Sequence, residues 1–286
     1  MLKQRLLTAA VLIPFLLYGI LGLATPYFAL MFAVFVLLAG WEWSGVMKQS
    51  SSSKRGVYSA VVGVLMATLW FFVSVTSADW LVLLVVSLFW WLSALIWVLT
   101  YPKSTSRWSS PWLLFLIGLL VLIPMWSAVV SLHQFGEQGP YLVLYLLALV
   151  SFADTGAYFG GRQWGKHKLA PEVSPGKTWE GVVSALVVTG IFSLIAANLF
   201  SLSGNQLPAF VVLSLITVTF SILGDLTESM FKRNAGLKDS GTILPGHGGV
   251  LDRIDGVTAA APVFVVGLWL GDFGLGGFVI SSGINL

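Results

Sequence analysis

The chain has 286 residues, of which 57% are hydrophobic and only 9% are charged, and it contains no cysteine. Soluble domains have about 25% charged residues, so this composition excludes a soluble globular protein and is typical of a polytopic α-helical membrane protein. The lack of cysteine excludes disulfides, thiolate metal sites and cysteine nucleophiles. The net charge of +3 is small, and we attribute it to membrane topology rather than to nucleic-acid binding.

Nine apolar segments follow one another along the chain, each near the ~20 residues that a helix needs to cross a bilayer. The predicted spans are residues 6–24, 27–47, 56–76, 80–99, 112–132, 141–160, 180–202, 208–230 and 256–280. Lys3 and Arg5 precede the first segment, as the positive region of a signal peptide would. Its apolar run is longer than the core of a signal peptide, so we expect it to be the first span.

The basic residues test this count, because loops on the two sides of a membrane differ in charge. All 15 Lys and Arg residues lie before the first span or in the even-numbered loops, and the odd-numbered loops hold none. Cytoplasmic loops carry an excess of Lys and Arg. The alternation predicts an all-α polytopic membrane protein of about nine transmembrane helices, with its N-terminus in the cytoplasm and its C-terminus outside.

The two halves of the chain differ in charge. Residues 1–140 form an N-terminal transmembrane region of about five spans with short loops and few acids. Residues 141–286 form a second transmembrane region with two charged loops, 161–179 and 231–255, in which we expect the catalytic site. No clear internal repeat relates the halves, which argues against a transporter built from inverted repeats.

Asp154 lies inside the sixth predicted span. An ionisable residue inside a membrane usually marks a functional site. Two alternatives are a packing role, in which the carboxylate bonds a nearby hydroxyl, and a pair with Arg162, two helical turns further on.

The loop at residues 161–179 contains a turn that resembles a phosphate-binding loop. The turn consists of Ser174, Pro175, Gly176, Lys177 and Thr178. It is not a Walker loop, because that motif requires a glycine where this chain has Pro171. A Gly-Lys-Thr turn that enters a helix still offers free N–H groups and a cation to a phosphate. The alternative is a basic loop that rests on anionic lipid headgroups.

The eighth loop carries two groups of acids, one at each of its ends. Asp225, Glu228, Ser229 and Lys232 share one face of the preceding helix, because they lie three, four or seven residues apart. Asp252 and Asp255 lie three residues apart at the entry to the last span, and glycines between the two groups let the backbone approach a ligand. Such oxygen ligands suit Mg²⁺, which also binds substrate phosphates. The alternative is a salt-bridged surface loop.

This loop also carries a recognisable signature. It reads Ser229-x-Phe231-Lys232-Arg233, Lys238-Asp239-x-Gly241, Leu244-Pro245-x-His247-Gly248-Gly249 and Asp252-Arg253-x-Asp255. The pattern resembles the signature of the phosphatidate cytidylyltransferase (CDP-diacylglycerol synthase) family, without a departure from it. The run from Asp154 to Tyr158, the run from Ser174 to Gly181 and the pair Gly224-Asp225 are similar to the same family, and the N-terminus and Trp41-Glu42-Trp43 resemble its bacterial members more weakly.

The resemblance implies an enzyme of phospholipid biosynthesis that transfers the cytidylyl group of CTP to phosphatidate and releases pyrophosphate. Its partners would be CTP, phosphatidate and membrane lipid, and its cofactor Mg²⁺, with room for a second cation. It would lie in the bacterial cytoplasmic (inner) membrane as a multi-pass protein with its active site facing the cytoplasm. A homodimer is expected only as the commonest kind of oligomer.

The resemblance also assigns roles to individual residues. The metal ligands would be Asp225 and Asp252, with Asp255 third. The catalytic residues would be these first two aspartates with Lys232, Arg233, Lys238 and His247. The substrate would be bound by Asp154, Ser174, Gly176, Lys177, Thr178, Ser229, Gly248, Gly249 and Arg253.

Two other functions remain open. A CTP-dependent membrane lipid kinase would move the γ-phosphate to an alcohol, but it would not need the whole signature. A transporter would place its charges at the middle of the membrane, whereas most charges here lie at span ends.

Overall fold

A computed structural model describes residues 2–49, 51–72, 78–271 and 273. The helices in this part are α1 (Leu2–Gly22), α2 (Thr25–Val46), α3 (Ser52–Phe72), α4 (Ala78–Leu99), α5 (Thr105–Trp108), α6 (Pro111–His133), the 3₁₀ helix η1 (Gly136–Gln138), α7 (Gly139–Trp164), α8 (Trp179–Leu199), α9 (Gln206–Ala235) and α10 (Leu251–Leu270). Two short strands, β1 (Lys168–Ala170) and β2 (Ser174–Thr178), form an antiparallel hairpin between α7 and α8. The all-α membrane fold is therefore confirmed, and the hairpin is an addition to it.

Eight helices of the described part are long and apolar enough to cross a membrane: α2, α3, α4, α6, α7, α8, α9 and α10. The first predicted span corresponds to α1, whose apolar part is the shorter segment Leu6–Gly22. All nine predicted spans thus coincide with helices, and the first of them has an apolar part that is short for a crossing.

The ends of the last two long helices differ from the prediction. Helix α9 continues past residue 230 to Ala235, and α10 begins at Leu251 instead of residue 256. The charged residues here do not end the helices, because they bond to one another across the helix pair, as Lys232 does with Asp252. The charged loop is therefore shorter than predicted, residues 236–250. The predicted end of the last span, at residue 280, lies outside the described residues.

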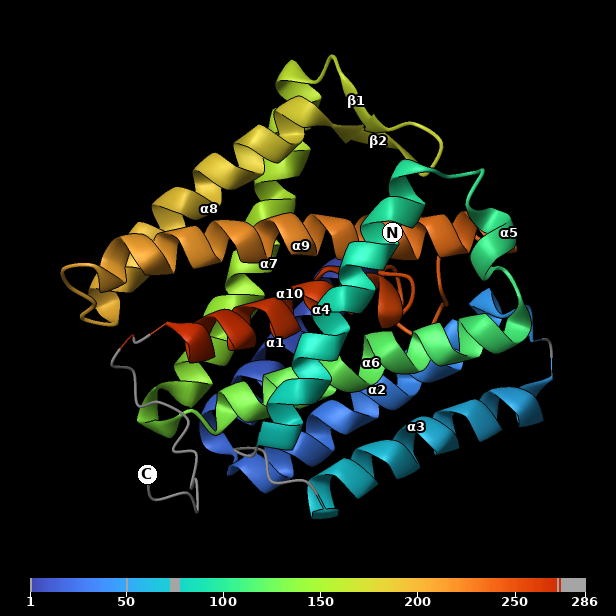
Figure 1. Ribbon diagram of the computed structural model, residues 1–286, viewed down its shortest axis with the longest axis horizontal. Helices are drawn as coiled ribbons and strands as arrows, with labels where there is room; N and C mark the ends of the chain where they lie inside the picture. The colour runs from blue at the N-terminus through green and yellow to red at the C-terminus, as the bar shows by residue number, and fades with distance from the viewer. Residues whose placement is uncertain (1, 50, 73–77, 272, 274–286) are drawn as a thin grey trace.

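Helices α6 and α10 form the centre of the bundle, because 72% and 67% of the residues in their most apolar 18-residue stretches are buried inside the protein. Figure 1 shows α9 and α10 running together through the middle of the molecule, with α2, α3 and α6 on one side and the β1–β2 hairpin on the other. Helices α9 and α10 meet closely at two glycines. A Cβ at Gly224 would lie 2.5 Å from the Asp255 carbonyl oxygen, and one at Gly256 would lie 2.6 Å from Ser221 Oγ. Small residues at such crossings bring backbones together, and here they bring together the acids of both helices.

The segments that carry most of the charge lie at one end of the bundle. Thr8 of α1 donates a hydrogen bond to the Pro245 carbonyl, and the Trp108 ring contacts Phe231 at 4.9 Å between centroids. At the opposite end, His133 of α6 bonds to Thr25 and to the Ile20 carbonyl. The segment from Phe231 to Pro245 therefore lies beside the start of α1 and beside α5, although these are far apart in the sequence.

Candidate active site

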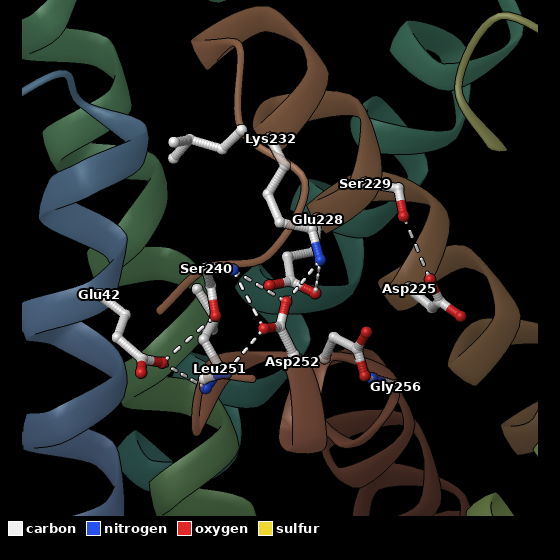
Figure 2. A network of polar contacts seen from close by, with 12 residues as sticks. Glu42, Asp225, Glu228, Ser229, Lys232, Ser240, Leu251, Asp252 and Gly256 are labelled. Carbon is white, nitrogen blue, oxygen red and sulfur yellow. Dashed lines mark hydrogen bonds and ion pairs between the residues drawn. The ribbon is translucent and has the colours of Figure 1, made fainter. Parts of the chain in front are cut away.

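A lysine between two acids joins α9 to α10. Lys232 Nζ lies 2.6 Å from Asp252 Oδ1 and 3.3 Å from Glu228 Oε2. Its side chain is 10% exposed, and those of Glu228 and Asp252 are 4% and 7% exposed. Figure 2 shows these three side chains pointing toward one another. Charges so deeply buried persist only when they are paired, so this cluster fixes the two helix ends relative to each other.

Asp252 also holds the loop that connects the helices, residues 236–250, here called the signature loop. Its Oδ1 and Oδ2 accept hydrogen bonds from the Ser240 backbone N–H at 3.1 and 3.0 Å. Its Oδ2 accepts another from the Gly249 N–H at 2.8 Å. Both oxygens of Asp252 are thus engaged by the chain itself, and the carboxylate organises the loop from one side.

The signature loop begins and ends in glycine turns. Gly236 ends α9 in the left-handed conformation, and its N–H and that of Leu237 donate to the Arg233 and Lys232 carbonyls, as in a Schellman motif. Gly246 and Gly248 also have positive φ, at 77° and 83°.

Between these turns lies a polar cavity of about 660 Å³, here called the loop cavity. Its lining includes Lys238, Asp239, Thr242, His247 and Arg253. The polar and basic lining suits a water-soluble anion.

The hairpin places a second charged group against the acids of α9. Thr178 ends β2 and caps α8, accepting a hydrogen bond from the Gly181 N–H at 3.2 Å. This fixes the end of β2, from which Lys177 Nζ reaches Asp225 Oδ2 at 2.5 Å. A cavity of about 460 Å³, here called the hairpin cavity, lies at this pair and is lined also by Asp154, Arg162 and Ser174. The residues predicted from two separate sequence motifs therefore meet in one site.

Asp154 of α7 lies among the charged residues of the hairpin cavity. It lines the hairpin cavity and interacts with Asp225, Lys177 and Arg253, the last of which lines the loop cavity. The alternative partner, Arg162, instead donates a hydrogen bond to the Tyr158 hydroxyl at 3.1 Å. The charges of Asp154 and Arg162 are therefore available to the hairpin cavity.

Glu228 of α9 and Asp255 of α10 are two further acids that interact with Asp225. The Asp255 carboxyl interacts with both Asp225 and Glu228, and Glu228 Oε2 also pairs with Lys232 Nζ at 3.3 Å. Oxygen donors of this kind suit Mg²⁺. No group of three or more acidic or histidine side chains in the described part of the chain is already arranged around a common metal position.

The structure places the predicted site residues in three groups, apart from Asp255, which lines a small cavity together with Glu228. Those that line a cavity or contact a lining residue are Asp154, Ser174, Gly176, Lys177, Thr178, Asp225, Ser229, Lys238, His247, Gly248 and Arg253. Lys232, Asp252 and Gly249 hold the signature loop in place instead. Arg233 is exposed at the end of α9 and donates to the Leu237 carbonyl at 3.3 Å. It lines neither the hairpin cavity nor the loop cavity.

Two buried acids outside the predicted metal set also contact this site. Glu228 shares a helix face with Asp225 and Lys232, which placed it in the acid group predicted to suit Mg²⁺, and it pairs with Lys232. Glu42, far away on α2, bonds to the signature loop at Ser240. Its signals were a lone carboxylate in an apolar span and the weak family resemblance of Trp41-Glu42-Trp43.

Comparison with known proteins covers nearly the whole chain. A model of the cytidylyltransferase family matches residues 3–270. The phosphatidate cytidylyltransferase of Pseudomonas aeruginosa is 43% identical over 274 residues, which span 96% of this chain and 99% of the relative. That of Haemophilus influenzae is 41% identical over 92% of this chain and 97% of its own length. That of Bacillus subtilis is 34% identical over 91% and 95%.

Proposed function

The chain belongs to the cytidylyltransferase family, and on that premise we propose how it makes CDP-diacylglycerol. It transfers the cytidylyl group of CTP to phosphatidate and releases pyrophosphate, in phospholipid synthesis. The observation that carries the proposal is the meeting of two cation–acid pairs, Lys177–Asp225 and Lys232–Asp252, beside two cavities at one end of a membrane bundle. Two anionic substrates, one lipid and one soluble, need such a meeting point.

The hairpin cavity suits the lipid substrate. It offers Lys177 and Arg162 to a phosphate, and it shares the lining residues Leu169, Val182 and Ile222 with an apolar cavity of about 290 Å³. That second cavity is lined mainly by apolar side chains of α4, the hairpin and α9. In the proposal, the phosphate of phosphatidate lies by Lys177 while an acyl chain extends into the apolar cavity.

The loop cavity suits CTP. Lys238 and Arg253 supply positive charge, and Gly246 and Gly248 leave the backbone open to a close approach. His247 lines the same cavity, with its Nδ1 buried and without a partner among the described residues. The triphosphate would extend from there toward Asp225, so that its α-phosphorus meets the lipid phosphate between the cavities.

An oxygen of the phosphatidate phosphate attacks the α-phosphorus of CTP, and the bond from that phosphorus to the bridging oxygen of pyrophosphate breaks. No covalent intermediate with the protein is needed, because positioning and charge neutralisation carry such transfers. Mg²⁺, when bound, would neutralise the phosphate oxygens. The residues that would hold it are Asp225 and Asp255, and Glu228 adds oxygen donors beside them, whereas the carboxylate oxygens of Asp252 already accept from Lys232, Ser240 and Gly249. Lys177, which pairs with Asp225 in the structure, would contact the lipid phosphate.

Radiolabelled CTP tests the reaction. With phosphatidate in detergent or in vesicles, label from the α-phosphate should enter the lipid fraction and label from the γ-phosphate should leave as pyrophosphate. Transfer of γ-label to a lipid alcohol would instead establish the lipid kinase. A chelator should abolish α-label transfer and added Mg²⁺ should restore it; full activity in the chelator would end the metal part of the proposal alone.

The proposal places the active site on the cytoplasmic side of the inner membrane. Because the chain has no cysteine, single cysteines introduced at Lys238 and at Glu137 can be labelled without background. Lys238→Cys should react only with thiol reagents that reach the cytoplasm, and Glu137→Cys in η1 only from outside. Reaction of both from the same side would contradict this orientation.

A further inference from the structure

Glu42 is an acid buried within an apolar helix. It lies on α2 with 2% of its surface exposed, between Trp41 and Trp43, more than one turn before the helix ends at Val46. A carboxylate in such a place is costly unless it is bonded. The hydrogen-bond partners of Glu42 therefore indicate its structural role.

All the hydrogen bonds of Glu42 go to the far end of the sequence. Oε2 accepts from the Leu251 N–H at 2.8 Å and from Ser240 Oγ at 3.3 Å. Leu251 is the first residue of α10, where backbone N–H groups lack partners within the helix and favour an anion. Figure 2 shows Glu42 extending from α2 to these two residues. The carboxylate therefore caps α10 and holds the signature loop at once.

Two glycines of the signature loop leave room for this carboxylate. A Cβ on Gly241 would meet only Glu42 within its closest contacts, at 2.3 Å from Oε1, 2.7 Å from Cδ and 2.9 Å from Cγ. A Cβ on Gly249 would lie 2.2 Å from Ser240 Oγ and 2.5 Å from Glu42 Oε2. Real Cβ contacts are not that short, so the loop backbone is folded around the Glu42 side chain.

The neighbouring residue, Trp43, contacts the signature at a second point. The Trp43 ring packs edge-on against Phe231 of α9, at 5.4 Å and 73°. Trp43 Nε1 donates to the Leu114 carbonyl at 2.9 Å, which fixes the indole to α6. This end of α2 therefore contacts the signature both before and after its loop.

We propose that Glu42 is a positioning residue that sets the shape of the loop cavity for the nucleotide. Glu42 and Asp252 hold Ser240 from opposite sides. The Ser240 hydroxyl donates to Glu42, and the Ser240 backbone N–H donates to Asp252. Between them the two acids fix both sides of the loop segment that begins with Lys238 and Asp239. The assignment of the nucleotide to this cavity rests on the proposed function.

The first test is a kinetic comparison of Glu42→Ala with wild type, in the full-length protein. We expect kcat/KM for CTP to fall about 10²-fold, the loss typical of a misplacement that starts away from the chemistry, with the KM for phosphatidate within about twofold of wild type. Glu42→Gln should recover most of the activity, because its amide oxygen can still accept from the Leu251 N–H.

Ser44→Ala is the matched control. Ser44 is also buried on α2, but its hydroxyl bonds only to the Gly40 carbonyl of its own helix. We expect its kinetic constants for both substrates to equal those of wild type, even if its thermal stability falls. An equal loss in Ser44→Ala and Glu42→Ala, or an unchanged kcat/KM for CTP per folded Glu42→Ala molecule, overturns the proposal.

Gly241→Ala probes the same contact without changing Glu42, so the test stands even if Glu42→Ala folds poorly, and a double-mutant cycle combines the two. Gly241→Ala alone should lose activity, because its Cβ meets the Glu42 carboxylate. Added to Glu42→Ala it should cost little more, because the obstructing side chain is gone, so the two losses should be far from multiplicative. Multiplicative losses overturn the contact.

If wild type itself transfers no α-label from CTP to lipid, the proposed function has failed. The thermal stability of the wild type, the two single variants and the double variant still reports the coupling between Glu42 and Gly241.

Discussion

The β1–β2 hairpin and the signature loop both bring charges to the active site, but the protein holds them in different ways. The signature loop is fixed by Asp252 on one side and Glu42 on the other, both deeply buried. The hairpin contacts the acids of α9 through the single pair Lys177–Asp225, whose side chains are 26% and 29% exposed. Removing one partner from a buried ion pair lowers stability strongly, whereas removing one from a partly exposed pair lowers it little. The comparison indicates a rigid signature loop, which the proposal assigns to the nucleotide, and a more adjustable hairpin, which it assigns to the lipid.

The largest effect is expected on the rigid side. Asp252→Asn leaves Lys232 buried without its closest partner and weakens the hold on Ser240 and Gly249. We expect the protein to lose about 3–5 kcal/mol of stability, as for other broken buried pairs, and kcat to fall at least about 10². Thermal unfolding in detergent measures the stability, and steady-state kinetics with one substrate varied at a time measure kcat. The double variant Lys232→Met/Asp252→Asn should regain stability and stay inactive; recovery of activity would contradict a role for Asp252 in the reaction.

Asp225→Asn should separate activity from stability. Because Asp225 is more exposed than Asp252, the melting temperature should stay close to that of wild type while kcat falls by about 10², the scale seen when a charge-stabilising group is removed. The apparent Mg²⁺ constant should rise in the same titration. A loss of stability as large as that of Asp252→Asn would remove the distinction between the two sides.

Lys177→Ala tests the hairpin itself. We expect a raised KM for phosphatidate, because a lysine that binds phosphate acts on the ground state and the transition state alike. Lys177→Arg should restore this only in part, since a guanidinium is a planar fork and not a compact ammonium. KM values for both substrates decide the result: a rise for CTP alone would move the triphosphate to the hairpin cavity, and normal values would leave Lys177 a lipid-surface contact.

The smallest effect is expected at the cap of α8. Thr178→Ala removes the acceptor for the Gly181 N–H and should cost about 1 kcal/mol of stability. The KM for phosphatidate should rise less than in Lys177→Ala, because the lysine is kept while its strand is held more loosely. Thr178→Ser keeps the acceptor and should behave as wild type. A Thr178→Ala protein with wild-type stability would show that the hairpin is held elsewhere.

The sequence by itself determined the helices and predicted where the charges gather. Apolar length predicted every long helix of the described residues because crossing a bilayer requires about 20 such residues. The dense charges around Asp225 and Asp252 predicted a functional site there because charge is costly near hydrocarbon. The helix ends were less accurate: α10 begins at Leu251, since Asp252 is satisfied by the chain and does not need to stay outside the helix.

Only the tertiary structure decided which charge bonds to which. Asp252 was an equal member of the predicted metal set, but its carboxylate oxygens accept from Lys232, Ser240 and Gly249. Glu42 could not be assigned, because its partner Leu251 lies 209 residues away and no local periodicity relates them. Hydropathy determines that a segment becomes a helix. The packing of small residues such as Gly224 and Gly256 determines which helices touch, and hence which buried carboxylate meets which N–H group.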